Sequence, residues 1–99
     1  MTLKQTIIDC QFDSLEKTDS NGLKGRDVAR VLREHRDVWS MFYFGGDSII
    51  VFPATGKDED LTKLFRIDRE NDHDPAPIWP DDAGWQEVEG KRYFWAWWD

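Results

Sequence analysis

The chain has 99 residues, a length that predicts a single domain spanning residues 1–99 with one hydrophobic core. Charged residues make up 33% of it and the net charge is −7, which disfavours nucleic acid and anionic membranes as partners and favours a basic protein. One cysteine excludes an internal disulfide, and the sequence lacks both a signal-peptide pattern and a long apolar run, so we expect a cytoplasmic protein without a membrane span.

The first elements are two helices. Residues 2–17 predict a helix with Thr2 and Gln5 as a capping box, although the alternation around Cys10 leaves a strand as the alternative. Its apolar face comprises Leu3, Ile7, Ile8, Cys10, Phe12 and Leu15. Residues 18–22 predict a turn. Residues 26–36 predict a second helix, with a buried stripe made of Val28, Val31, Leu32 and His35.

Two β-hairpins and a third helix follow. Residues 38–44 and 48–52 are rich in aromatic and β-branched residues and flank a glycine turn, which predicts a hairpin. Residues 57–67 predict a short helix that begins with acids, and residues 68–84 an irregular loop. Residues 85–98 predict a second hairpin that turns at 89–91. The fold class is therefore α+β, with two to three helices packed on one face of a largely antiparallel sheet.

The last predicted strand is unusually aromatic. Residues 92–98 read RYFWAWW, and in a strand Tyr93, Trp95 and Trp97 point to one side. Phe94, Ala96 and Trp98 point to the other side. Few helices are available to cover the sheet, so we expect one row in the core and the other partly open. The alternative is that Trp79 and Trp85 fold back over the open row.

No catalytic, cofactor or metal motif is recognisable. Cys10 on an apolar helix face is predicted to be a small core residue, and His35 a core or cap residue at the helix end. No phosphate-binding glycine loop is present. Residues 68–74 have the acidic alternation of a calcium loop, but His73 stands where glycine is needed and Trp79 where glutamate is needed. We therefore expect neither an enzyme nor a metal site.

Acidic residues recur at every second position in the predicted loop, at Asp68, Glu70, Asp72 and Asp74. In an extended segment these carboxylates share one face at a spacing of roughly 6.6 Å. With Asp81 and Asp82 they would form an anionic surface that imitates phosphate, and the alternative is a solvated loop. An arginine stripe on the second helix (Arg26, Arg30, Arg33, with Arg36 close by) leaves weak nucleic-acid binding as a further alternative.

Together these features predict a non-enzymatic protein that binds and blocks a basic surface on another protein, for example on a nucleic-acid-handling enzyme. Toxin immunity proteins, phage anti-defence proteins and nucleic-acid mimics are of this kind. The acids above would steer association. The predicted aromatic contacts are Trp79, Trp85, Trp95, Trp97 and Trp98. A structural module that homodimerises through its tryptophan-rich strand is the alternative.

Overall fold

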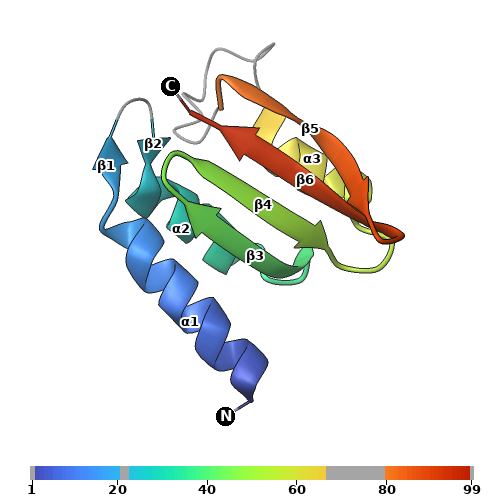
Figure 1. The fold of residues 1–99 in the computed structure, drawn as a ribbon, viewed down its shortest axis with the longest axis horizontal. Coiled ribbons are helices and arrows are strands. Elements are labelled where there is room, and N and C mark those ends of the chain that lie inside the picture. Colours follow the sequence, from blue (N-terminus) through green and yellow to red (C-terminus); the bar gives the residue numbers. More distant parts are fainter. Residues whose placement is uncertain (1, 21–22, 67–79, 99) are drawn as a thin grey trace.

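The computed structural model describes residues 2–20, 23–66 and 80–98 (Figure 1). In chain order its elements are α1 (Leu3–Glu16), β1 (Asp19–Ser20), β2 (Leu23–Lys24), α2 (Gly25–Glu34), β3 (Trp39–Gly45), β4 (Ser48–Pro53), α3 (Asp58–Arg66), β5 (Asp82–Val88) and β6 (Lys91–Trp97). The main sheet is antiparallel with the strand order β3-β4-β6-β5. In Figure 1, α2 and α3 lie behind this sheet and α1 lies beside β3. The predicted α+β class is confirmed.

Helix α1 confirms the helical interpretation of residues 2–17. The Thr2 hydroxyl accepts a hydrogen bond from the Gln5 amide at 3.1 Å, but the Gln5 side chain donates to Asp9 at 2.8 Å, so only half of the capping box forms. Ile8, Phe12 and Leu15 are buried. The prediction that Cys10 is a core residue is wrong, because its side chain is exposed. Cys10 lies two residues from Ile8, about 200° around the helix.

Helix α2 begins at Gly25 and ends at Glu34, close to the predicted span. Val28, Ala29 and Leu32 are buried. His35 occupies the C-cap, as one interpretation predicted, but it is exposed, so its predicted place in a buried stripe is wrong.

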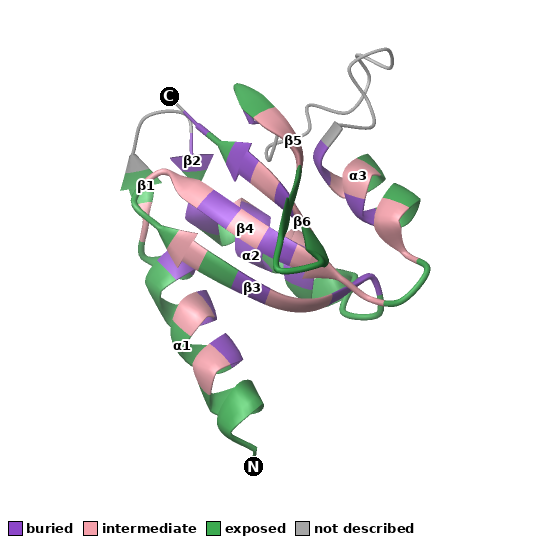
Figure 2. Cartoon of the chain, turned by 45° about the vertical axis from the view of Figure 1, so that its right-hand side comes forward, coloured by how far each residue is buried: buried purple, intermediate pink, exposed green. Residues whose placement is uncertain are grey.

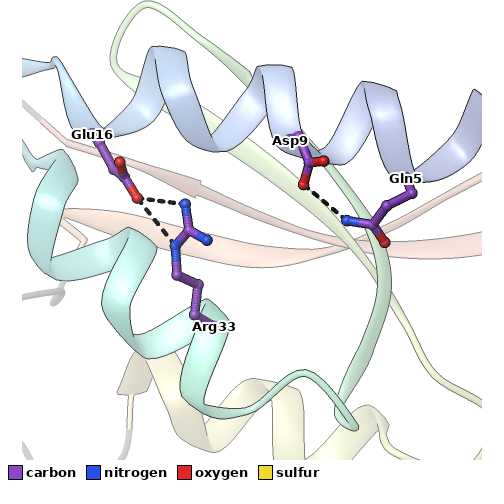
Figure 3. Close-up of polar contacts among 4 residues, drawn as sticks. All are labelled: Gln5, Asp9, Glu16 and Arg33. Carbon is purple, nitrogen blue, oxygen red and sulfur yellow. Dashed lines mark hydrogen bonds and ion pairs between the residues drawn. The ribbon is translucent and has the colours of Figure 1, made fainter. Parts of the chain in front are cut away.

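The two N-terminal helices are held close together by backbone contacts and one ion pair. The Gly25 amide donates to the Thr18 carbonyl at 2.9 Å, and a Cβ atom on Gly25 would overlap the carbonyl oxygen of Leu15. Arg33 donates to Glu16 through two nitrogens, at 2.6 and 3.1 Å (Figure 3). Between the helices, β1 and β2 form a short antiparallel pair where the sequence predicted only a turn.

The core lies between the helices and one face of the sheet. Phe12 of α1 packs against Trp39 and Phe42 of β3, with ring centroids 5.8 and 4.8 Å apart. On the other side of the core, Phe65 of α3 packs against Phe94 of β6 at 5.1 Å. Burial therefore alternates along β4 and β6 and is concentrated on the helices' inner faces (Figure 2).

Both predicted hairpins form. Gly45 pairs with Ser48 across the first turn, and Val88 pairs with Lys91 across the second. Glu89 and Gly90 have φ angles of 51° and 80°, the signs that a type I′ turn requires. Strand β5 begins at Asp82, so the end of the predicted loop 68–84 is wrong: residues 82–84 pair with β6. Residues 67–79 lie outside the described residues.

Candidate functional site

The two sides of β6 have opposite environments. Phe94, Ala96 and Trp98 are fully buried against the helices. Tyr93 and Trp95 are half-buried and Trp97 is 38% exposed. The expectation that one aromatic row is in the core while the other stays partly open is therefore confirmed.

The open row belongs to a larger apolar surface that crosses the sheet. Strand register aligns Tyr43 and Ile50, and then Ile50 and Trp95, side by side. We call this surface the open face; it comprises Met41, Tyr43, Ile50, Phe52, Val88, Tyr93, Trp95 and Trp97. Figure 1 looks onto it, and none of the described helices covers it. Tyr43 and Val88 are 43% and 50% exposed.

Ring contacts join the strands on the open face. Tyr43 meets Phe52 at a centroid distance of 6.3 Å, and Phe52 meets Tyr93 at 5.9 Å. The Tyr93 hydroxyl then donates to Gln86 of β5 at 2.9 Å. This row spans all four strands of the sheet, so its side chains hold one another in place.

Trp95 lies directly over a glycine. A Cβ atom on Gly84, its register partner in β5, would come within 3.0 Å of the Trp95 indole. The missing side chain thus leaves space in which the indole lies close to the β5 backbone. A tryptophan fixed in this way loses little rotamer freedom when a partner binds.

A groove of about 520 Å³ lies at one end of the open face. Its apolar lining includes Met41, Tyr43, Phe52 and Pro53. Its charged wall combines Lys91 with the Arg92–Asp58 ion pair, whose atoms are 2.8 Å apart. The groove offers an aromatic floor beside charged groups, a combination suited to one inserted side chain of a partner.

The predicted aromatic contacts divide between the two faces. Trp95 and Trp97 lie on the open face, as expected of accessible contacts. Trp85 lies on the helix side, where its ring packs against Phe94 at 5.4 Å and its indole N–H donates to Thr62 at 2.9 Å. Trp98 is 1% exposed, so its assignment as a partner contact is corrected: it is a core residue.

The predicted acidic contacts are mostly outside the described residues. Asp81 and Asp82 are exposed at the start of β5. Asp68, Glu70, Asp72, Asp74 and Trp79 lie in the segment that the structure does not describe.

Sequence reasoning missed the part of the open face that β3 and β4 contribute. Tyr43, Ile50 and Phe52 alternate with the buried Phe42 and Val51. The same alternation that separated the two rows of β6 would have identified them, had it been applied to the first hairpin.

The arginines of α2 are largely engaged within the chain. Arg33 bonds to Glu16 and lies 4.1 Å from the centroid of the Phe12 ring. Arg36 lies 4.0 Å from the Trp39 ring and donates to its backbone carbonyl at 2.7 Å. Arg30 is 3.7 Å from Asp27. Of the three arginines on α2, Arg26 is the one without an ion pair among the described residues, and Arg36, which follows α2, forms no ion pair among them either.

Three further properties concern the described residues alone. No group of three or more His, Cys, Asp or Glu side chains there is placed to hold a metal ion. No helix in this part of the chain has the length and apolar character needed to cross a membrane. Cys10 and His35 are both exposed.

Comparison with known proteins adds no relative. The chain matches no protein-family model, and no curated protein or solved structure shows significant similarity to it. The geometry of the open face is therefore the basis for a functional proposal.

Proposed function

We propose that the chain is a non-enzymatic inhibitor that docks its open face on a basic surface of another protein and blocks that surface. The observation that carries this proposal is the aromatic face of the sheet, which the described helices leave uncovered. Contiguous exposed apolar surface in a small protein marks an interaction site.

The composition of the open face supports a protein as its partner. Tyrosine and tryptophan are enriched among the residues that dominate binding energy at protein interfaces, and charged residues are depleted from the centres of such interfaces. The open face follows this pattern, because its rows carry Tyr43, Phe52, Tyr93, Trp95 and Trp97 without a charge between them.

The net charge supports a basic surface on that partner. A chain of charge −7 attracts cationic surfaces over a distance of about one Debye length, roughly 8 Å at physiological salt. Carboxylates also satisfy arginine and lysine side chains that otherwise hold phosphate. A nucleic-acid-handling enzyme has such a groove, and the acids at 68–74, 81 and 82 are suited to occupy it.

The first test is a pull-down from host lysate at low salt, with bound protein released by rising salt and identified by mass spectrometry. We expect a stoichiometric basic protein that is recovered by the wild type and lost by the double variant Tyr43→Ser, Trp97→Ser. Leu3→Ser is the matched control, because Leu3 is 76% exposed but lies on α1, away from the open face.

The purified partner then separates the aromatic and acidic contributions. Reversing Asp68, Glu70, Asp72 and Asp74 to lysine should slow association and weaken its salt dependence. Equal binding by the charge-reversed and wild-type proteins would contradict the acidic part of the proposal. Equal binding by the open-face double variant would contradict the aromatic part.

The same uncovered face favours a second candidate, a homodimer through the open face. Light scattering over a range of protein concentrations distinguishes the two candidates. A mass that stays at one chain, 11.7 kDa, contradicts the dimer. A rise to twice that mass that is abolished by Tyr43→Ser, Trp97→Ser would assign the open face to self-association.

A further inference from the structure

The two edges of the main sheet differ in whether another described element contacts their outward backbone groups. Strands β3 and β5 form the edges. At the β3 edge, the outward amide of Phe44 donates to the Gln11 side chain of α1 at 2.8 Å, so a packed helix occupies that edge. At the β5 edge no described helix or strand takes the equivalent place.

Register identifies which backbone groups of β5 do not pair with β6. Val88 and Lys91 flank a two-residue turn and therefore exchange hydrogen bonds, as do Gln86 with Tyr93 and Gly84 with Trp95. The amides and carbonyls of the intervening Trp85 and Glu87 point away from β6. Ala83 also faces away from β6, and its amide donates to the Asp82 side chain at 2.9 Å. The outward amides and carbonyls of Trp85 and Glu87 have no hydrogen-bond partner within the described part of the chain.

The side chains along this edge are acidic. Asp82 and Glu87 lie in β5, and Glu89 follows in the turn; all three are exposed. Among the described residues, none of the three forms an ion pair. Arg92 is the register partner of Glu87, but it pairs with Asp58 and lies 4.6 Å from the Trp85 ring.

We propose that the β5 edge receives an extended, lysine- or arginine-containing segment of the partner protein as a fifth strand of the sheet. Such β-augmentation takes its affinity from main-chain hydrogen bonds and its specificity from alternate side chains. One row of the added strand would extend the open face beside Val88 and the Trp95 indole, and the other row would face Glu87. This inference rests on the proposed function and names the mode in which the basic partner binds.

A second copy of the chain is a poor occupant of the same edge. Two β5 strands placed side by side would bring Asp82, Glu87 and Glu89 of both copies into one seam, and like charges across strands are destabilising. A basic strand instead neutralises these carboxylates. Charge complementarity therefore selects a basic partner.

Amide exchange tests whether the edge is free. In the isolated protein the amides of Trp85 and Glu87 should exchange much faster than those of Gly84 and Gln86, which donate to β6. Equal protection of all four amides would show that the edge is already covered, and it would overturn the proposal.

A peptide of alternating lysine and valine is the binding probe, followed by NMR shifts of the labelled protein. We expect shifts along 83–88 and at least tenfold weaker binding when alternate peptide amides that face β5 are N-methylated. N-methylation of the other set should have little effect. Absence of shifts at millimolar peptide, or equal binding by both methylated forms, would overturn the proposal.

Two substitutions at one position isolate the backbone donor. Glu87→Pro removes the charge and the outward amide, whereas Glu87→Thr removes the charge alone. The proline should weaken peptide binding at least tenfold relative to the threonine, and equal binding by the two would count against a fifth strand. If Glu87→Pro does not fold, the methylated peptides decide the question.

Failure of this inference is distinguishable from failure of the proposed function. If the partner recovered by pull-down is lost by Tyr43→Ser, Trp97→Ser but retained by Glu87→Pro, the inhibitor function stands and the fifth strand does not. If no partner is recovered while the peptide binds as expected, the β5 edge is supported as a strand-binding site and the inhibitor function is not.

Discussion

Two buried tryptophans differ in whether their indole N–H has a partner. The Trp39 indole donates to the Leu32 carbonyl at 2.8 Å, close to the end of α2, where carbonyls lack partners within the helix. The Trp98 indole N–H is buried and has no hydrogen-bond partner among the residues that the structure describes. Leaving such a donor unpaired costs about 1–3 kcal/mol.

We therefore expect Trp39→Phe to lower the free energy of unfolding more than Trp98→Phe does. The difference between the two variants should be about 1–3 kcal/mol. Both substitutions remove the same atoms from buried sites, but the first leaves a carbonyl unpaired and the second removes an unpaired donor. Urea unfolding monitored by far-UV circular dichroism gives both values. Equal losses would mean that water or a small shift satisfies the Trp98 indole in solution.

At the scale of elements, the contact between α1 and α2 depends on a glycine. Gly25 begins α2 directly against the Leu15 carbonyl, where no Cβ atom fits. Gly45 in β3 has nothing within 4 Å of the position that a Cβ would take. Alanine at Gly25 would therefore be crowded, whereas alanine at Gly45 would not, and the second substitution is a control for the first.

Gly25→Ala should destabilise the chain by about 1–3 kcal/mol, as overpacking does, although alanine is the better helix former. Gly45→Ala should stay within about 0.5 kcal/mol of wild type, as surface substitutions do. Thermal unfolding of the two variants provides the comparison. A neutral Gly25→Ala would show that the helices can separate slightly without loss of core packing.

Local pattern was sufficient to predict most elements, because the period of apolar residues differs between helix and strand. It placed α2, α3 and both hairpins close to their observed spans. It failed for Cys10 and His35, whose burial depends on how far each helix is rotated toward the sheet. It also missed the start of β5 at Asp82, where pairing with Trp97 overrides an acidic, loop-like sequence.

The candidate site was predictable only in part for a related reason. The alternation within β6 separated an inner from an outer row, but Trp98 was still expected to be accessible. The pairing of β4 with β6 joins segments far apart in sequence, and no local pattern specifies that neighbour. Alternation could have placed the outer residues of β3 and β4 on one face of their own hairpin, but only the folded sheet shows that this face continues into the outer row of β6.

At the scale of the whole molecule, the net charge of −7 opposes compaction. In every described ion pair both side chains are about one-third exposed or more, so these pairs contribute little to the free energy of unfolding. The stability lost when salt weakens the ion pairs is therefore smaller than the stability gained when salt screens the repulsion among the excess negative charges. We expect the free energy of unfolding to rise between 20 and 300 mM sodium chloride, by up to about 1 kcal/mol. Urea unfolding at each concentration measures it, and a decrease would show that the ion pairs outweigh the repulsion.

Strand β6 occupies the interior of the sheet although it follows every other described element in the chain. While the protein is being made, β4 and β5 therefore lack their common neighbour until Trp97 has left the ribosome. A nascent chain that has reached only the β5–β6 turn still exposes the apolar sides of α3 and β4 that Phe94 and Trp98 later cover. The sheet consequently closes only after β6 has been made, and a chain released before that point is exposed to chaperones and proteases.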